Sequence, residues 1–592
     1  MSTENSTQSH RLVRLNTILG EKALIASRFN GTETMSEGFN FTIQAFSESH
    51  HDLSAKDLVG TAVTVGLVKS DNTIRYFNGF VQEMSALGSE RDGQRSNYTL
   101  QIVSWAQLFM KKRVDTRIFQ EKNIEDIIKD VFVSYGANAK FKFNLKSAHL
   151  PRRFCVQYNE TDWNFFNRLC RLEGVAYYFK HENGKHVLHI IDDQSGCETL
   201  NPQTVKIQSQ NIKEDYLTNW QNTGRFITGK YSQRTYNYLR PTTLSPVEHT
   251  VASDVSLTKG IESYQYNEYS HDKTDATEDL KRKSRVNTQK ATVSTATGNC
   301  RHLVIATHFD LALANGKDFT DKGKEFTFSK INISADDVSG ILSCHIEAIP
   351  KGELAYPKAE YPKIEGLQTA VVTGPQGEEI HTDDLGRIKV QFHWDRLGKL
   401  DQKSTCFLRV MQSFAGSSFG AHFTPRIGQE VVVAFENGNP DRPFVLGGLY
   451  HQEHKPPYGE QKGTRAGIRT RSTKGGGITD ANELYLEDTK GSEEFYIQAQ
   501  KDLNGVIKND ETRSVGNDQT ITINNDQSIT VSNNQTTEVS KNSSHLIGDE
   551  LLLEAGKKIT LKVGGSTVEL TSGKIIIKSG VVDIDGSTVQ IN

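Results

Sequence analysis

Residues 507–550 read IKNDETRS VGNDQTIT INNDQSIT VSNNQTTE VSKNSSHL IGDE when they are divided into groups of eight, and each group opens with valine or isoleucine. Two positions later, the first four groups carry asparagine and the last two carry Lys541 and Asp549. Short repeats of β-branched and turn-forming residues are typical of stacked strands joined by bends, as in a solenoid or a fibre. No single group can bury its own apolar residue, so we expect the core to come from stacking and from other chains. The residues that open the groups are Ile507, Val515, Ile523, Val531, Val539 and Ile547.

Beyond Leu561 the repeat shortens to seven residues and carries two apolar rows, two residues apart. Apolar residues of a coiled coil are spaced by three and four, whereas here the spacing is two and five and nearly all of them are β-branched. This pattern predicts a short strand with both apolar side chains on one face, followed by a turn at small residues such as Ser572 and Gly573. The first row is Leu561, Val568, Ile575, Val582 and Val589, and the second is Val563, Leu570, Ile577, Ile584 and Ile591.

An eight-residue unit is too short to circle a single-chain β-helix, but it fits one side of a triangle. Three chains wound together would each supply one side, share one axial core and cover one another's strand edges. Neighbouring strands lie about 4.8 Å apart, so the repeats up to Ile591 would build a stiff shaft on the order of 50 Å long. We expect the axial core to consist of Ile507, Val515, Ile523, Val531, Val539, Ile547, Val563, Leu570, Ile577 and Ile584.

Two other repeat architectures fit this segment less well. Calcium-binding β-rolls use nine-residue units with paired glycines and a fixed Asp. Here the unit has eight residues, and the acidic position becomes Asn534 and Asn542 in two of the groups. A catalytic single-chain β-helix would need longer coils.

Length and composition exclude several classes of protein for this 592-residue chain. Its length predicts several domains, and its formal charge of -3 argues against a protein that binds nucleic acid or membrane surfaces through net charge. The N-terminal MSTENSTQSHRLVRL lacks the apolar core of a signal peptide, and no stretch of about 20 apolar residues could span a membrane. Scattered cysteines without a CxxC motif fit a reducing compartment and indicate no zinc framework. These cysteines are Cys155, Cys170, Cys197, Cys300, Cys344 and Cys406.

The first third of the chain predicts antiparallel sheet with a few helices. Residues 10–110 alternate in the manner of strands, and turn signals stand at Asn30-Gly31, Asp71-Asn72 and Asp92-Gly93. The spacing predicts a helix over 123–135 and another within 158–179, the latter ending at Gly174. The predicted helix stops are Gly136 and Gly174, and the predicted cap of the first helix is Asn123.

Residues 370–450 predict a small strand-rich module. Alternation from Ile388 to Trp394 and the run 431–435 indicate strands, the second of them buried on both sides, and a turn follows at 437–441. Short strands within about eighty residues favour a barrel of the oligonucleotide/oligosaccharide-binding (OB) type. Acidic and basic residues are balanced in this segment and no basic stripe carries aromatic residues, so we expect no nucleic-acid binding.

At this point several motifs, in the same order along the chain, resemble the VgrG family, the spike of the bacterial type VI secretion system, which is related to the hub and needle of contractile phage tails. YNETDWNFFNRLCRLEGVAYYF at 158–179 resembles a family segment, with a small departure at 170–173. DDLGRIKVQFHWD at 383–395 resembles a second, with His393 where proline is common. The barrel motif residues are Asp384, Gly386, Arg387, Trp394, Pro425, Arg426, Gly428, Pro440 and Asp441.

The resemblance implies a mainly β homotrimer: a hub-like β-barrel base with a few helices, a small OB-type barrel and a C-terminal intertwined triple-stranded β-helix. The implied domains are a phage-hub-like base at 1–365, an OB neck at 370–455, a connector at 456–504 and the needle at 505–592. It implies a spike that sits on the Hcp tube, carries effectors or adaptors under a PAAR-repeat cap and punctures the target membrane. Such a protein waits in the bacterial cytoplasm and is secreted by the type VI system without a signal peptide.

The sequence offers no catalytic site, cofactor site or metal site. Gly416-Ser417-Ser418-Phe419-Gly420 fits G-x-S-x-G, but a nucleophile elbow needs a strand before it and a helix after it, and Pro425 follows instead. The pairs His50-His51 and His451 with His454 lack further ligands at metal spacing. We expect no enzyme, since the repeat runs to Asn592 and leaves no room for a catalytic extension. A spike with effector activity and a spike or hub of a contractile phage remain alternatives.

The predicted tip consists of Val589, Gln590, Ile591 and Asn592. Three copies would form a small blunt triangle whose outward backbone groups a partner could satisfy. Some phage spikes hold an iron ion with histidines near the terminus, whereas no histidine follows His545 here. We therefore expect a PAAR-type protein, rather than a metal of the chain's own, to cap the tip.

Replacing Val531 with Asp should destabilise the shaft severely, because the trimer would hold three carboxylates together on its axis without water or a partner. We expect a loss of roughly several kcal/mol per trimer, the usual order for an unpaired buried charge. Asn533→Ser, at a predicted corner, should be far milder. Thermal unfolding of the two variants checks this, and equal stability would mean that Val531 does not lie on the axis.

Overall fold

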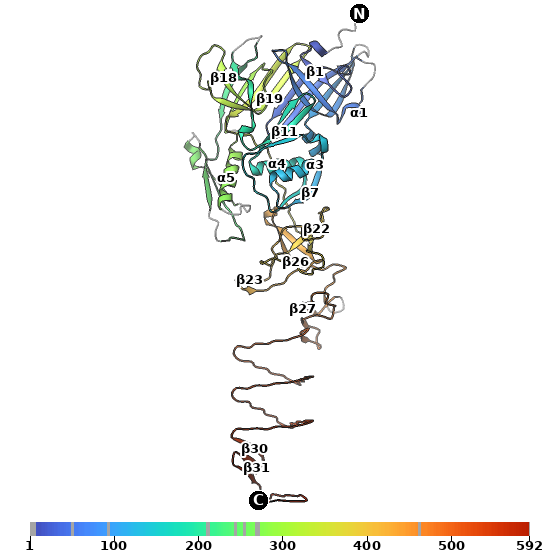
Figure 1. Cartoon of the computed structure of the whole chain (residues 1–592), viewed down its shortest axis with the longest axis vertical. Coiled ribbons are helices and arrows are strands. Elements are labelled where there is room, and N and C mark those ends of the chain that lie inside the picture. The colour runs from blue at the N-terminus through green and yellow to red at the C-terminus, as the bar shows by residue number, and fades with distance from the viewer. Residues whose placement is uncertain are drawn as a thin grey trace. The chain divides into compact units, whose positions relative to one another are not determined.

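The computed structural model of the chain describes residues 8–48, 53–90, 95–208, 214–241, 246–252, 256–266, 273–289, 291–459 and 463–590. The chain folds as two compact units, residues 1–502 and residues 503–592, and each is described by itself (Figure 1). The expected turn at Asp92-Gly93 and the pair His50-His51 lie outside the described residues. The fold is mainly β, as predicted.

A twelve-stranded sheet forms the body of the first unit, with the strand order β1-β4-β5-β6-β3-β2-β19-β18-β12-β13-β17-β20. Because β19 also pairs with β20, the last six strands of this order close into a ring, which we call the second barrel. The bounds are β1 Val13–Asn16, β2 Ile25–Thr34, β3 Gly38–Ser47, β4 Ala62–Val68, β5 Ile74–Glu90, β6 Arg95–Val103, β12 Glu198–Ile207, β13 Leu217–Gly224, β17 Thr292–Gly298, β18 Thr307–Leu313, β19 Glu325–Asp336 and β20 Ile341–Pro350.

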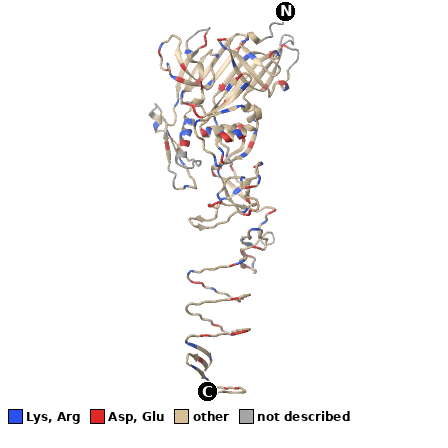
Figure 2. Cartoon of the chain, viewed as in Figure 1, with Lys and Arg blue, Asp and Glu red and all other residues tan. Residues whose placement is uncertain are grey.

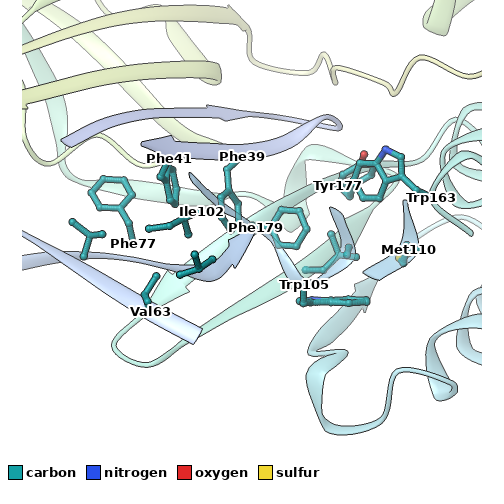
Figure 3. Close-up of a cluster of buried hydrophobic side chains, with 14 of the residues drawn as sticks. Phe39, Phe41, Val63, Phe77, Ile102, Trp105, Met110, Trp163, Tyr177 and Phe179 are labelled. Atoms are coloured by element: carbon teal, nitrogen blue, oxygen red, sulfur yellow. The ribbon is translucent and has the colours of Figure 1, made fainter. Parts of the chain in front are cut away.

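The first six strands alternate as the sequence predicted, and one face carries an aromatic core. Phe39 and Phe41 of β3 stack at 4.5 Å between ring centroids, and Phe77 of β5 meets Phe41 edge-on. Figure 3 shows these rings in one cluster, with Phe39 next to Phe179. Buried aromatic side chains of this size dominate core energetics, so this cluster fixes the register of β3 against its neighbours.

The prediction of a turn at Asn30-Gly31 is wrong, because both residues lie inside β2. A Cβ added to Gly31 would come within 2.8 Å of the ring of Phe29 and 3.0 Å of the ring of Phe41. The glycine therefore leaves room for two aromatic rings. The turn at Asp71-Asn72 is confirmed, with Asn72 at a φ of 64°.

The two predicted helices are confirmed. α3 spans Ile124–Val133, and the side chain of Asn123 caps it by accepting a hydrogen bond from the amide of Asp126. α3 ends three residues before the predicted stop at Gly136. α4 spans Asp162–Glu173 and ends at Gly174, which adopts a φ of 64°.

The remaining helices and strands of this part lie outside the twelve-stranded sheet. They are α1 Ala55–Leu58, α2 Trp105–Met110, α5 Lys273–Thr288, β7 Val114–Phe119, β8 Phe141–Asn144, β9 Cys155–Thr161, β10 Ala176–Glu182, β11 Lys185–Ile191, β14 Lys230–Arg234, β15 Val247–Thr250 and β16 Glu262–Tyr266. We call everything from β1 to β20 the base. Among the described residues, no helix is long and apolar enough to cross a membrane.

A four-stranded sheet in the order β22-β21-β25-β26 forms a domain that we call the neck. Its core contains Val390, Phe392, Val431 and Val433. The expectation that 431–435 is buried on both sides is wrong for the single chain, because burial alternates along β25. The bounds are β21 Gln368–Thr373, β22 Lys389–Phe392, β25 Glu430–Phe435 and β26 Pro443–Leu449.

Three antiparallel strands follow the neck, and they end the first unit. Arg465 of the first strand stacks on the ring of Tyr485 in the second, 3.7 Å from its centroid, and Tyr485 stacks in turn on Tyr496. The strands are β27 Arg465–Arg469, β28 Glu483–Glu487 and β29 Glu494–Gln498.

The second unit, which we call the shaft segment, shows the octad repeat as a series of bends. The backbone bends at 508–509, 516–517, 524–525, 532–533, 540–541 and 548–549, once every eight residues. Residues 503–557 make no strand pairing. The period predicted from the sequence is therefore present in the backbone, whereas the described part of the chain supplies no backbone hydrogen-bond partners for these extended stretches.

The heptad repeat folds into three antiparallel strands, β30 Lys558–Val563, β31 Ser566–Thr571 and β32 Lys574–Lys578. Leu561 lies opposite Val568, which lies opposite Ile577. The turn between β31 and β32 falls at Ser572-Gly573, as predicted. Since alternate residues of a strand share a face, both apolar rows lie on one face of this sheet.

Candidate functional site

The apolar rows of the shaft segment are exposed in the single chain. The six residues that open the octads are between 44% and 55% exposed, with Ile523 the least exposed and Ile507 the most. Of the expected heptad core, Val563 is 83% exposed, Ile577 and Ile584 are exposed, and Leu570 is half-buried. A continuous exposed apolar surface of this kind marks an interaction site.

The corners between the octads carry a repeated polar contact. The side-chain amide of Asn509 donates to the carboxylate of Asp510 at 3.0 Å, and Asn517 and Asn525 make the same contact to the Asp that follows each of them. Asparagine tolerates the backbone of tight turns and bonds locally there. The polar residues of the repeat thus shape the bends, and the aliphatic residues remain available for other chains.

The expected tip lies at the edge of the described residues. Val589 is 51% exposed and Gln590 is exposed, whereas Ile591 and Asn592 lie outside the described residues. The role of the tip therefore stays a prediction.

A second cluster of functional residues joins the neck to the base, and we call it the junction. Asp441 enters the base from the turn of the neck, where its Oδ1 accepts a hydrogen bond of 2.6 Å from the amide of Val156 in β9. The Arg168 guanidinium of α4 donates to the carbonyl of the same Val156 at 2.7 Å and pairs with Glu160. One residue of β9 is thereby held by the neck on one side and by α4 on the other.

Burial raises the pKa of the Asp441 carboxyl, whereas the Arg168 guanidinium and the bond from Val156 act in the opposite direction. Close by, the Glu173 carboxyl has a pKa of about 2, since burial, which raises it, is outweighed by the Arg152 guanidinium and a bond from His149. The junction is therefore a buried network in which opposite charges offset one another. Removing one member leaves a buried charge without its partner, which is strongly destabilising.

The two sequence motifs of the chain meet at this junction. The indole of Trp394 in the neck donates to Gln368 at 2.9 Å, and Gln368 donates to the hydroxyl of Tyr158 at 2.8 Å. Arg396 pairs with Asp115 of the base at 2.8 Å. Sequence reasoning placed Tyr158 and Trp394 in separate motifs and did not predict that the side chains touch.

The other barrel-motif residues act within the neck or close to it. Arg387 pairs with Asp383 and donates to the hydroxyl of Tyr238 at 2.7 Å. Arg426 donates to the carbonyl of Arg471 at 2.7 Å. Gly386 and Gly428 adopt positive φ values of 66° and 90°, which explains the glycines. Asp384 is exposed and Pro440 is buried, whereas Pro425 is half-buried.

The serine motif and the histidine pair that the sequence singled out can be placed in the structure. Ser418 sits at the tip of a hairpin between β23 Ala415–Gly416 and β24 Phe419–Gly420, with a φ of 64°, and among the described residues no α-helix follows it. The rings of His451 and His454 lie 4.5 Å apart between centroids and are tilted by 43°. Within the described ranges, no three His, Cys, Asp or Glu side chains are grouped so as to hold a metal ion. Acidic and basic side chains are interspersed (Figure 2).

Three family models match the chain. The model described as phage tail baseplate hub (GPD) matches residues 32–338, within the base. The type VI secretion system/phage-baseplate injector OB domain matches 368–450, which is the neck. The bacteriophage T4 gp5 C-terminal trimerisation domain matches 466–575, which includes β27 to β31 and the octads.

Several curated proteins are similar to the chain. Type VI secretion system spike protein VgrG1b of Pseudomonas aeruginosa is 32% identical over 529 residues, which is 86% of this chain and 70% of that protein. VgrG1a of the same organism is 30% identical over 620 residues, 99% of this chain and 92% of that protein. The actin cross-linking toxin VgrG1 of Vibrio cholerae is 30% identical over 526 residues, 83% of this chain and 46% of that protein.

Among solved structures, the E. coli c3393 protein, described as a component of the type VI secretion system similar to the T4 tail proteins gp27 and gp5, has a TM-score of 0.53. The match covers 74% of this chain and all of that one, at 18% identity. At this identity the likeness shows a shared fold.

Asp441→Ala should destabilise the first unit, because it leaves the buried amide of Val156 without an acceptor and removes a negative charge beside Arg168. We expect a loss of about 1–3 kcal/mol, the usual cost of an unsatisfied buried group. Chemical unfolding of the full chain measures the loss.

Two matched variants sharpen this experiment. Asp441→Asn keeps an oxygen that can accept from Val156 and should be milder, and Asp384→Ala, at an exposed position of the same domain, should stay within about 0.5 kcal/mol. Equal stability for Asp441→Ala and Asp384→Ala would show that the junction does not hold the neck.

Proposed function

The chain belongs to the VgrG family of type VI secretion spike proteins, and from this premise we propose that three copies form a non-enzymatic spike that caps the Hcp tube, punctures target membranes and carries effectors. The shaft segments of the three copies would wind around one axis. The base would contact the tube, and the tip would accept a PAAR-repeat protein.

One observation carries the proposal. The rows that open the octads, from Ile507 to Ile547, are exposed in the single chain and fall in the segment matched by a trimerisation domain. Burying one valine or isoleucine side chain contributes about 1.5–3 kcal/mol. A row repeated along the whole segment therefore supplies a large driving force for association, and its eight-residue period fits one side of a three-chain prism.

The support for the proposed partners at the two ends of the spike, the Hcp tube at the base and the PAAR-repeat protein at the tip, is less direct than the support for the trimer. The match of residues 32–338 to a phage tail baseplate hub supports a base that serves as the hub of the spike. Relatives named as type VI spikes favour the secretion system over a phage tail. We propose accordingly that the chain waits in the bacterial cytoplasm and leaves the cell through the secretion system.

The proposal assigns no catalysis to this chain. Ser418 lies on a hairpin without a neighbouring helix, and the described histidines form no metal-binding group. The toxin among the relatives matches this chain over 46% of its own length. Its name supports the idea that spikes of this family deliver toxic activities, and we propose that this chain delivers effectors as separate proteins or through adaptors.

Removing residues 505–592 should abolish export of the tube protein while leaving a soluble base, because the base and neck have their own cores. Complementation of a strain lacking the gene, with Hcp export measured by immunoblotting of the culture supernatant, tests this. Full-length Asn533→Ser serves as the matched control and should export normally. Export by the truncated protein would show that the shaft is dispensable.

The proposed tip should bind a PAAR-type protein through Val589, Gln590, Ile591 and Asn592. Co-purification of residues 480–592 with a PAAR protein encoded nearby, with and without these four residues, measures the contribution of the tip. We expect the deletion to abolish capture. Undiminished capture, or a stoichiometric metal in the isolated shaft, would contradict a tip that relies on a protein cap.

A further inference from the structure

Two cysteines lie against each other inside the second barrel. Cys344 lies in β20 opposite Gly298 of β17, and Cys300 follows Gly298 by two residues. Both side chains belong to the core of this barrel, with exposed fractions of 0% for Cys300 and 4% for Cys344. The two thiols lie close enough for each to shift the pKa of the other. Cys300 lies just beyond the end of β17, so the register of β17 against β20 places it near Cys344.

Both neighbours of Cys300 are fixed to the segment before β13. The amide of Asn299 donates to the carbonyl of Tyr216 at 3.1 Å, and the side chain of Asn299 accepts from the amide of Tyr216 at 2.9 Å. The amide of Arg301 donates to the carboxylate of Asp215 at 3.0 Å. Because hydrogen bonds hold the residues on either side, Cys300 cannot easily turn away from Cys344.

The charges around the two thiols differ. Arg75 of β5 is buried, and one of its terminal nitrogens pairs with Glu33 at 2.5 Å while the other, Nη1, has no hydrogen-bond partner. The Cys300 thiol and the charge of Arg75 lower the pKa of Cys344. The Cys344 thiol, burial and the Asp215 carboxylate raise the pKa of Cys300. The thiolate, which is the nucleophile in thiol chemistry, is therefore favoured at Cys344.

We propose that Cys300 and Cys344 are a dithiol that a small disulfide such as oxidised glutathione converts into an intramolecular disulfide. The Cys344 thiolate attacks one sulfur of glutathione disulfide, forming a mixed disulfide and releasing one glutathione thiolate. Cys300 then gives up its proton and attacks the Cys344 sulfur, releasing the second glutathione. Two protein thiols are oxidised and one glutathione disulfide is reduced to two glutathione thiols, so atoms and electrons balance.

The other four cysteines serve as internal controls. Burial raises the pKa of Cys155, Cys170, Cys197 and Cys406, so each remains a thiol at neutral pH. A protonated thiol attacks disulfides slowly. The chemistry should therefore select the pair in the second barrel, although Cys197 and Cys406 are less deeply buried.

The bond would close a covalent loop from the end of β17 to β20 and so fix both strands of the second barrel. Its timing rests on the proposed function, since a fired spike passes from a reducing cytoplasm into an oxidising envelope. The dithiol chemistry itself rests only on the positions of Cys300, Cys344 and Arg75. A failure of export would therefore leave it untouched, and a failure to oxidise would leave the spike function untouched.

Incubation of the folded full-length protein with a series of reduced and oxidised glutathione mixtures tests the proposal. We expect the protein to lose two thiols and become about 2 Da lighter, with one disulfide per chain. Proteolysis without reduction, followed by mass spectrometry, should yield a peptide that links Cys300 to Cys344, and the thermal unfolding temperature should rise relative to the reduced protein.

Three variants distinguish the attacking cysteine, Cys344, from the cysteine that closes the bond, Cys300. Cys300→Ser should stop at a mixed disulfide on Cys344, which adds about 305 Da. Cys344→Ser should leave Cys300 unmodified, and Cys170→Ser should still form the bond. Peptide mapping of the wild-type protein decides the matter if a variant fails to fold. Thiols of Cys300 and Cys344 that stay reduced in the folded protein, or a bond that forms only in denaturant, would overturn the proposal.

Discussion

The shaft segment carries apolar side chains at every repeat, and within its described residues these side chains are left largely uncovered. Residues 503–557 make no strand pairing, and the sheet of β30 to β32 has one apolar face and no second layer. An exposed strand edge with apolar side chains invites uncontrolled association. Three identical chains resolve this problem, because each covers the edges of the other two and the bends every eight residues let one side of a prism follow the next. The proposed trimer depends on this constraint.

The first unit, unlike the shaft segment, is held together by contacts within its own chain. Base and neck have separate cores, and the two are joined by a network in which the amide and the carbonyl of Val156 are held from opposite sides, by Asp441 and Arg168. Buried pairs of this kind add little net stability, but losing one partner is costly. Such a network favours one arrangement of neck and base over all others, which suits a protein that must withstand mechanical load. The shaft depends on its partners, whereas the first unit folds from its own contacts.

Residue patterns within short stretches of the sequence predicted many of the helices, strands and bends. The features that they did not predict depend on contacts between residues far apart in the chain. Period and burial revealed α3, α4 and the octad bends, since each depends on neighbours within a few residues. The glycine at position 31 suggested a turn. It is needed instead to leave room for the rings of Phe29 and Phe41, and the local sequence does not show that these rings lie there. Burial along β25 alternates because only one face of this strand packs against the core of the neck. Nothing local indicates that Asp441 meets Val156, or that Cys300 meets Cys344, because the fold alone brings these residues together.

Three chains in one particle is the central claim, and the mass of the intact protein tests it most directly. Light scattering coupled to size-exclusion chromatography should give about three times the 66.2 kDa of one chain, without dissociation on dilution. Hydrogen exchange on the same sample should show protected amides throughout residues 507–577, since the backbone partners of the octads would come from neighbouring chains. A monomer with those amides equally protected would contradict the account, because the single chain would then be able to bury its own repeats.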